Sequence, residues 1–391
     1  MTLNNLNIEQ NSYNWNKEPI FDLNGVRDST YSHIDLFSGC GGFSVGFEQA
    51  GFNTDVSVDI HPQSIDTIKK NHKNTSTILG DIRKVDPKDV KNILNPNSKF
   101  SVVTAGVPCQ GFSLSNRKRN KCDERNFLFL EFIRFAEFLQ PDAVILENVS
   151  GLASLNDGQF KNDISLAIKE LGYHVHFKLL NAADYGVPQN RRRVFFIGVK
   201  DNVSWLFPDA NYGTEKEKYN TVKDAITGDL PSLKNNEESY VYSGQPVSKL
   251  QKYLRGKNKI LHNHKSPNHP SETINKIRNT KQGKPMYENF KQRIRLDNDL
   301  PSPTQVCGGI RPQFQFGHPI DPRGLTIRER ARIQSFPDSY IFEGGTVQGR
   351  VQTGNAVPPL LAKSIATQLK RAFEQKKLKG IEGDYEHAKL F

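Results

Sequence analysis

Short apolar runs alternate with amphipathic stretches over the first half of the chain, and this alternation limits the possible folds more than any other feature. The runs that favour strands occupy residues 33–37, 54–58, 101–104, 143–146, 174–180 and 194–199. The stretches with helical periodicity occupy residues 44–50, 63–71, 127–139 and 163–171. Because strands that alternate with helices usually pair in parallel, the pattern predicts an α/β domain with a mostly parallel sheet.

The alternation ends near residue 199, where the composition changes. The following region is rich in Asn, Lys and Pro and has weak periodicity, which is typical of short elements joined by long loops. Helical patterns return at residues 326–335 and 360–373. The sequence therefore predicts a polar tail at residues 1–28, a first domain at residues 29–199 and 326–391, and a smaller irregular domain at residues 200–325.

Composition indicates the partner and the compartment. The 391 residues carry 53 Lys and Arg against 42 Asp and Glu, and this net charge of +11 favours a polyanion, because Lys and Arg displace the counterions of phosphates. No apolar run approaches the length of a membrane span. The 4 cysteines form no CxxC pair, so a zinc site has little support and we expect no metal. We see no export signal and expect a reducing cytoplasm.

A cysteine stands directly beyond one of the strand candidates, in the run Ala105-Gly106-Val107-Pro108-Cys109. A lone cysteine held between Pro and Gly residues, with basic residues after it, suits a thiolate nucleophile. The alternative is a small buried hydrophobe, which is the role of most cysteines. Glu147 ends another apolar run, where burial could raise the pKa of a carboxylate. Arg191 and Arg193 precede a third run, and we expect both on one strand face.

Residues 35–43 (Asp-Leu-Phe-Ser-Gly-Cys-Gly-Gly-Phe) form a strand candidate followed by a tight glycine turn into a helix. Glycines at such a turn let a ligand approach the backbone closely. The dinucleotide fingerprint GxGxxG is not met, because Ser44 takes the place of its third glycine, and this disfavours a nicotinamide dehydrogenase. An ordinary strand–helix turn remains the alternative.

These segments, in this order, resemble the motifs of the cytosine-C5 DNA methyltransferases from Asp35 to about Ala366. The resemblance implies a Rossmann-like domain that binds S-adenosylmethionine, with residues 200–325 as the target-recognition domain. It also implies methyl transfer to C5 of a cytosine flipped out of a short sequence in duplex DNA. The chain departs from the family at Asp59, where Glu is more common, and at Val107, where the family typically has Pro.

The family match also assigns roles to single residues. Cys109 adds to C6 of the cytosine, Glu147 acts at N3, Arg193 lies at O2 and Arg191 supports it. Asp59 binds the ribose hydroxyls of the cofactor. The residues implied to line the cofactor pocket are Phe37, Gly39, Gly41, Gly42, Phe43, Asp59, Ile60, Asp81, Ile82, Pro108, Leu128, Asn355 and Ala356. Those implied to contact DNA are Ser113, Ser115, Arg117, Lys118, Arg119, Gln189, Thr304, Gly308 and Gly309.

The resemblance is to bacterial modification enzymes, and so it implies a cognate restriction endonuclease as a genetic rather than a physical partner. We expect a monomer, because an asymmetric reader can place one base without a symmetric partner. One alternative is a tRNA cytosine-C5 methyltransferase of the same fold, although this chain lacks the Cys-Phe-Thr triplet of that branch. The other is a catalytically silent DNA-binding homologue, against which the intact Cys109, Glu147, Arg191 and Arg193 argue.

Overall fold

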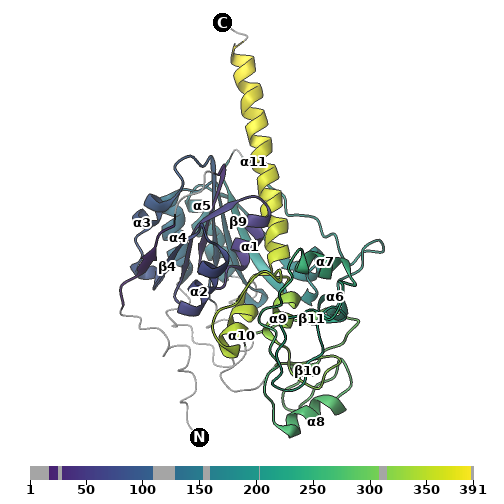
Figure 1. Ribbon diagram of the computed structural model, residues 1–391. Helices are drawn as coiled ribbons and strands as arrows, with labels where there is room; N and C mark the ends of the chain where they lie inside the picture. Colours follow the sequence, from purple (N-terminus) through teal and green to yellow (C-terminus); the bar gives the residue numbers. More distant parts are fainter. Residues whose placement is uncertain are drawn as a thin grey trace.

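The structure is a computed structural model that describes residues 17–24, 29–108, 128–152, 159–201, 203–307 and 315–388. Within these ranges a layered α/β body lies beside a smaller body of short elements. A long C-terminal helix begins between the two and projects beyond them (Figure 1). In the same ranges, no helix combines the length and the apolar character needed to cross a membrane.

The layered body contains an eight-stranded sheet with the order β1-β4-β3-β2-β5-β6-β9-β7. Its strands are β1 (Ile20–Asp22), β2 (Tyr31–Leu36), β3 (Asn53–Asp59), β4 (Ser76–Leu79), β5 (Phe100–Gly106), β6 (Ala143–Val149), β7 (His174–Asn181) and β9 (Arg192–Val199). The five strands β4, β3, β2, β5 and β6 are parallel to one another. The three antiparallel pairs are β1 with β4, β6 with β9, and β9 with β7. The mostly parallel sheet predicted from the sequence is thus confirmed.

The strand order places a switch point in the middle of the sheet. The chain passes from β2 to β3 on one side, while β5 pairs with the other edge of β2. In open α/β sheets, loops that leave such a pair of strands diverge and open a crevice at the carboxyl ends, which is where ligands bind. The glycine turn follows β2 and the cysteine run follows β5, so both predicted site segments begin at this crevice.

Two strands at one end of the sheet, β1 and β4, differ from the sequence prediction. Residues 20–22 lie in the predicted polar tail, yet they form β1, which pairs with β4 from Ile20 opposite Leu79. The strand β4 has only 4 residues, and three of its side chains are buried although two of them are Ser and Thr. A strand this short shows no alternation, so its place in the sheet depends on tertiary contacts rather than on local pattern.

Helices cover both faces of the sheet. On one face lie α1 (Gly42–Gln49) and the first half of α11 (Pro359–Ala388). The other face is covered by α3 (Pro87–Ile93), α4 (Leu128–Leu139) and α5 (Gln159–Glu170), while α2 (Pro62–Asn71) packs beside β3 and β4. Helices α1 and α11 can pack closely because Gly46 has no side chain. A Cβ at this position would lie only 2.5 Å from the Cβ of Ala362.

A chain of polar side chains crosses the centre of the sheet without contact to solvent. The ring of His33 lies between two hydroxyls, 3.0 Å from Thr54 Oγ1 and 2.9 Å from Thr104 Oγ1. Thr104 donates to Asp35 at 2.9 Å, and Ser44 donates to the other oxygen of Asp35 at 2.7 Å. Burial lowers the pKa of His33 to about 3 and raises the pKa of Asp35 to about 6. The imidazole is therefore neutral, and each polar group has a partner, as buried groups require.

The smaller body has its own hydrophobic core. Its elements are α6 (Val222–Ile226), α7 (Lys249–Arg255), α8 (Ser271–Asn279), β10 (Ile294–Arg295) and β12 (Phe316–Gly317). The helix α9 (Ile327–Ile333), which the sequence assigns to the first domain, packs Ile333 into this core and packs Ile327 and Ala331 against Cys40 and Val45 of the layered body. The helix therefore joins the two bodies rather than belonging to one of them.

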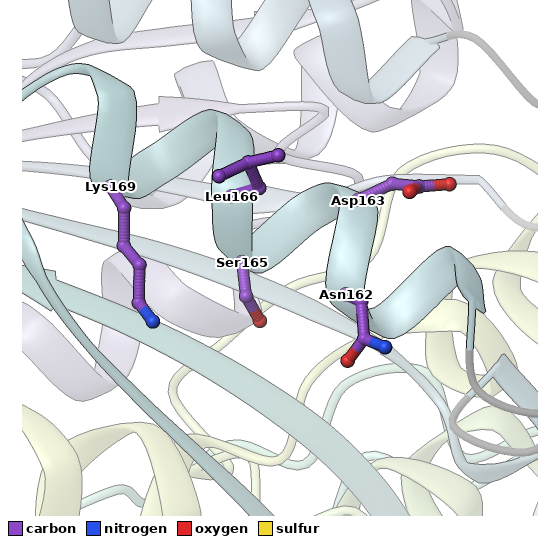
Figure 2. A pocket seen from close by; sticks show the side chains of 5 residues that line it. All are labelled: Asn162, Asp163, Ser165, Leu166 and Lys169. Carbon is purple, nitrogen blue, oxygen red and sulfur yellow. The ribbon is translucent and has the colours of Figure 1, made fainter.

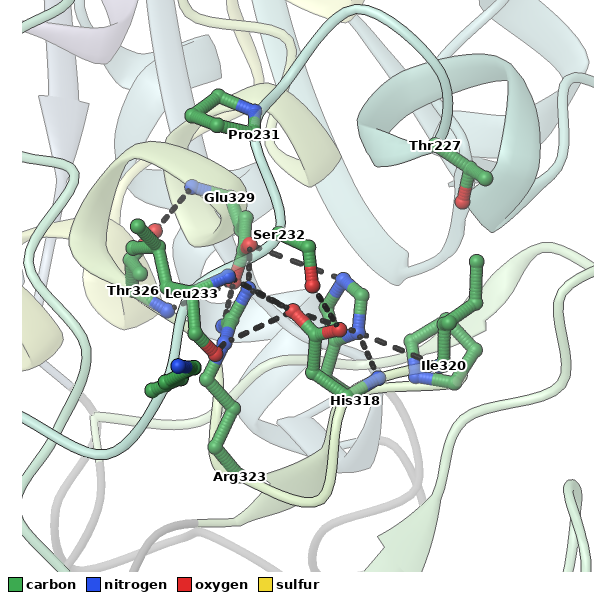
Figure 3. A network of polar contacts seen from close by, with 12 residues as sticks. Thr227, Pro231, Ser232, Leu233, His318, Ile320, Arg323, Thr326 and Glu329 are labelled. Atoms are coloured by element: carbon green, nitrogen blue, oxygen red, sulfur yellow. Dashed lines mark hydrogen bonds and ion pairs between the residues drawn. The ribbon is translucent and has the colours of Figure 1, made fainter. Parts of the chain in front are cut away.

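A buried ionic network stabilises the smaller body around the start of α9 (Figure 3). Arg323 donates to both oxygens of Glu329 at 2.9 and 2.7 Å and also pairs with Asp321 at 2.9 Å. Thr326 caps α9 through a reciprocal capping box with Glu329. Burial alone would raise the pKa of Glu329, but Arg323 and His318 hold it well below its usual range. The buried carboxylates of Glu329 and Asp321 thus share Arg323 as an ion-pair partner.

Candidate active site

The glycine turn after β2 has the backbone geometry of a ligand-binding loop. Phe37, Gly39 and Gly41 all adopt positive φ angles, of 53°, 52° and 81°. A Cβ added to Gly39 would meet no atom of the described residues within 4 Å, so these residues leave the space in front of the turn open. Asp59, at the end of β3, accepts from Gly39 N and from His61 N, each at 2.8 Å. The open turn and the adjacent carboxylate fit a cofactor with a polar sugar.

Three predicted cofactor residues of this segment face protein atoms. A Cβ on Gly41 would lie 2.8 Å from the hydroxyl of Tyr340, and one on Gly42 would lie 2.2 Å from the carbonyl oxygen of Val357. Phe43 is buried in the core and packs edge-on against Phe47. Gly41 and Gly42 therefore lack side chains that would collide with Tyr340 and Val357 of the C-terminal segments. The sequence pattern did not indicate this second requirement for glycine.

On the far side of the turn lie the residues expected around the adenine ring. Asp81 caps the 3-10 helix Ile82–Lys84 and is almost fully buried. Arg83 Nη2 pairs with Asp81 Oδ2 at 2.6 Å, and Arg83 N donates to Asp81 Oδ1 at 3.0 Å. Ile82 is buried, whereas Ile60 and Leu128 are partly exposed. In this structure the Asp81 carboxylate is oriented by Arg83, a partner that the sequence did not indicate.

The other side of the crevice brings Glu147 next to the run that leads to Cys109. The strands β5 and β6 pair with Gly106 opposite Glu147, and a Cβ on Gly106 would lie 3.8 Å from Glu147 Oε2. Asn148 Nδ2 donates to the carbonyl oxygen of Val107 at 3.3 Å and so fixes the exit from β5. Cys109 itself lies outside the described residues, and Pro108 is the last described residue before it.

Glu147 forms a buried ion pair with Arg193. The distance from Arg193 Nε to Glu147 Oε1 is 3.0 Å, and the two side chains are 12% and 9% exposed. Arg193 reaches Glu147 because β9 runs antiparallel to β6, with Arg193 opposite Val149. Burial raises the pKa of Glu147, although Arg193 and Arg191 oppose this. The carboxyl group therefore keeps its proton to higher pH than a free Glu, which suits a general acid.

Arg191 has a different surrounding from Arg193. It precedes β9, so the two arginines are not alternate residues of one strand as the sequence predicted. Arg191 is 1% exposed and donates to two backbone carbonyls, Gln305 O at 3.0 Å and Asn355 O at 3.3 Å. It therefore ties together the start of β9, the segment after β11 (Ser302–Pro303) and the end of α10 (Thr346–Asn355).

The predicted DNA contacts fall into three groups. Gln189, in the short strand β8 (Gln189–Asn190), is fully buried, with its amide oxygen accepting from Gln305 N at 2.8 Å and its amide nitrogen next to Gln334. In the described structure Gln189 thus contacts Gln305 and Gln334 rather than solvent, and its contact with DNA stays a prediction. Thr304 is partly exposed and donates to Asn190 O at 2.7 Å. The remaining residues, Ser113, Ser115, Arg117, Lys118, Arg119, Gly308 and Gly309, lie outside the described residues.

A depression lies on the surface of α5 (Figure 2). Asn162, Asp163, Ser165, Leu166 and Lys169 line it, and all five side chains come from the same helix. Its volume of about 350 Å³ is mostly open to solvent, and none of the predicted site residues lines it. The carboxyl ends of β2, β3, β5 and β6 thus remain the candidate site.

Known proteins share both this sequence and this fold. The model of the C-5 cytosine-specific DNA methylase family matches residues 31–371. The type II methyltransferase M1.HphI of Haemophilus parahaemolyticus is 37% identical over 347 residues, which cover 86% of this chain and 85% of that protein. The type II methyltransferase M.DdeI of Desulfomicrobium norvegicum is 37% identical over 375 residues, which cover 87% of this chain and 89% of that protein.

A solved structure agrees with these matches. A crystal structure from Escherichia coli, described as a prophage-encoded DNA modification methyltransferase, superposes with a TM-score of 0.74 at 27% identity and covers 88% of this chain and 99% of that one. The agreement spans both the layered body and the smaller body, because the match covers most of each chain. Fold, site geometry and relatives lead to one conclusion: the chain belongs to the C-5 cytosine-specific DNA methylase family and is a DNA cytosine-5-methyltransferase.

Proposed function

We propose that this protein methylates C5 of a flipped-out cytosine in a short duplex DNA sequence through covalent addition of Cys109 to C6. The observation that carries the proposal is the buried Glu147–Arg193 pair at the end of β6, 3.0 Å apart. This pair lies beside Gly106, three residues before Cys109 in the sequence. A proton donor and a fixed cation next to a thiol are the groups that nucleophilic addition to a cytosine ring requires.

Each residue has a defined task in the addition. The Cys109 thiolate forms the S–C6 bond, and the electron pair of the C5=C6 bond is displaced into the ring toward N3. Protonated Glu147 donates its proton to N3, so the ring becomes a neutral enamine. Arg193 stabilises the partial negative charge at O2 and keeps a positive charge near the thiol, which lowers the pKa of such a group. After methyl transfer, N3 returns its proton to the Glu147 carboxylate, and loss of the C5 proton to solvent re-forms the C5=C6 bond as the thiolate leaves.

S-adenosylmethionine, when bound, supplies the electrophilic methyl group for this reaction. The open turn at Gly39 and the carboxylate of Asp59 would hold its amino acid and ribose parts, while Asp81 and Ile82 would lie at its adenine ring. The support for this placement is that these residues follow the neighbouring strands β2, β3 and β4 at one edge of the sheet, where Gly39 N donates to the Asp59 carboxylate and Gly80 N donates to Asp59 O. Asp59 keeps free lone pairs for hydroxyl groups, because each of its oxygens accepts one backbone N–H here.

We further propose that the protein acts as a monomer in the bacterial cytoplasm, where it protects DNA from a cognate restriction endonuclease. The names of its relatives M1.HphI and M.DdeI, both type II methyltransferases, support this role. Residues 200–325 would read the target sequence. Their surface carries exposed cations next to aromatic rings, such as Lys276 with its ammonium 4.7 Å from the ring centre of Tyr287.

Methyl transfer from labelled S-adenosylmethionine to unmethylated genomic DNA tests the proposal. Wild-type protein and Cys109→Ser are incubated in parallel, and bisulfite sequencing then locates 5-methylcytosine. We expect methylation within one short motif for the wild type and none for the variant. Label in tRNA but not in DNA would contradict the duplex substrate, and motif methylation by Cys109→Ser would contradict the nucleophile.

A further inference from the structure

A side chain from the C-terminal half of the protein touches the glycine turn of the cofactor crevice. Tyr340, between α9 and α10, is almost fully buried and donates its hydroxyl to the carbonyl oxygen of Cys40 at 2.5 Å. A Cβ on Gly41 would lie 2.8 Å from the same hydroxyl, so a larger residue there would displace it. The hydroxyl therefore contacts the turn between Gly39 and Gly41.

Two further side chains support the hydroxyl from behind. His72 Nε2 lies 3.1 Å from Tyr340 Oη, and His72 Nδ1 lies 2.8 Å from Glu48 Oε1. Because Tyr340 gives its single hydroxyl hydrogen to Cys40, its oxygen must accept from His72. Burial raises the pKa of Tyr340 well above its usual value, so the hydroxyl stays a donor. The chain of contacts ends at Glu48, whose side chain is 38% exposed.

The rest of Tyr340 is also fixed. Its carbonyl oxygen accepts from Arg328 Nη2 at 2.6 Å, and Arg328 Nε donates in turn to His262 O at 2.9 Å. Its ring packs against Phe336 and Phe342, with ring centres 5.0 and 5.4 Å away. The position of the hydroxyl is thus set by α9 and the smaller body, not by the turn that it contacts.

The turn needs such support because its backbone is strained. Phe37 has a backbone φ angle of 53°, which residues other than Gly rarely adopt. Residues in such conformations persist only where the surrounding structure holds them. Asp59 binds Gly39 N and Tyr340 binds Cys40 O, so the two contacts hold the peptide groups that precede and follow the Gly39–Cys40 peptide.

We propose that Tyr340 is a positioning residue for S-adenosylmethionine, and that its hydroxyl, supported by His72 and Glu48, holds the Phe37–Gly41 turn in the conformation that binds the cofactor. The proposal rests on the proposed function, because it assumes that the cofactor binds at this turn. It predicts that loss of one hydroxyl, remote from the reacting atoms, weakens cofactor binding without loss of the fold.

The chain offers a matched control for this test. Tyr173 is equally buried and donates its hydroxyl to Pro141 O at 2.8 Å, but Pro141 precedes β6 and so lies at the opposite end of the sheet. Tyr340→Phe and Tyr173→Phe each remove one buried hydroxyl bonded to a backbone carbonyl. Tyr340→Phe should lower the melting temperature somewhat more than Tyr173→Phe, because it also leaves His72 Nε2 without the hydroxyl that accepts from it, and both variants should still fold.

Calorimetric titration with S-adenosylmethionine in the absence of DNA gives the decisive readout. We expect Tyr340→Phe to raise the dissociation constant about threefold to tenfold, the range of one hydrogen bond, and Tyr173→Phe to leave it unchanged. The kcat at saturating cofactor and the KM for DNA should stay near wild type in both variants. Equal dissociation constants in both folded variants would overturn the proposal.

Two further results remain informative. If Tyr340→Phe does not fold, Glu48→Gln probes the same chain of contacts from its exposed end: a raised dissociation constant supports the proposal, and an unchanged one overturns it. A wild-type protein that binds no S-adenosylmethionine would instead refute the proposed function, and the titration separates that failure from a failure at Tyr340.

Discussion

The substitution Gly354→Ala tests how closely the segments of the site are packed. Gly354, near the end of α10, precedes Asn355 and lies against the backbone after β11. A Cβ there would lie 2.4 Å from Cys307 N and 2.5 Å from the carbonyl carbon of Val306. Since ordinary contact begins at 3.4 Å, the two backbones would have to separate by about 1 Å.

The cost follows from this overlap. One extra methyl group in a close-packed site destabilises a protein by about 1–3 kcal/mol, and the higher helix propensity of Ala offsets at most about 1 kcal/mol. We expect a net loss of about 1–2 kcal/mol and a melting temperature lower by about 2–4 °C. Arg191 donates to Gln305 O and Asn355 O and so holds together the same two segments. Because their separation would move Asn355, which is expected to line the cofactor pocket, the affinity for S-adenosylmethionine should fall as well.

Differential scanning calorimetry and cofactor titration measure the two effects. Gly244→Ala is the control, because a Cβ there would meet only Gly228 O, at 3.9 Å, and the residue has no positive φ. Removing this glycine should leave stability unchanged or slightly raised. A Gly354→Ala protein as stable as Gly244→Ala would refute the packing argument.

Three more predictions concern charged groups. Glu147→Gln should lower kcat about 10²–10⁴-fold without changing cofactor affinity. The wild-type rate should fall as pH rises through the raised pKa of Glu147, because the proton donor is then lost. A pH–rate profile of the variant should lack this fall. Arg332→Met should cost about 3–5 kcal/mol in urea unfolding, because it removes the cation that lies 2.6 Å from each of the buried carboxylates of Asp229 and Asp338 and leaves Asp338 with Arg328, 3.8 Å away; an unchanged midpoint would contradict this. The pKa of Asp35 is raised from 3.8 to about 6 in the folded state, so its ionisation destabilises the fold progressively as pH rises between these values. The free energy of unfolding of Asp35→Asn relative to wild type should therefore increase from pH 4 to pH 7. A difference independent of pH would argue against a buried, ionising Asp35.

Features with local signals could be predicted from the sequence. The central strands and the helices of the layered body follow from apolar periodicity, which fixes both the element type and the buried face. The glycine turn and the site of Glu147 follow from their positions directly after such strands. The strand β1 could not be predicted, because a polar three-residue segment joins a sheet only through the edge that β4 offers it.

Contacts between distant segments carry no such signal. The approach of Arg193 to Glu147 depends on β9 running antiparallel to β6, which local pattern does not decide. Gln189 was predicted as a DNA contact because of its motif, but its burial against Gln305 and Gln334 is a tertiary property. Tyr340 lies 300 residues from Cys40 in the sequence, so only the folded structure brings it to the turn.

The central claim is that Cys109 bonds to C6 while Glu147 serves as the proton donor. The most direct test uses duplex DNA with 5-fluorocytosine at the methylated position found by bisulfite sequencing, incubated with S-adenosylmethionine. Fluorine cannot leave C5 as a proton does, so the thiolate cannot be released. We predict a denaturant-stable protein–DNA adduct for the wild type, slower adduct formation for Glu147→Gln and none for Cys109→Ser. Methylation of ordinary DNA with no adduct on the fluorinated duplex, or an adduct with Cys109→Ser, would contradict the account.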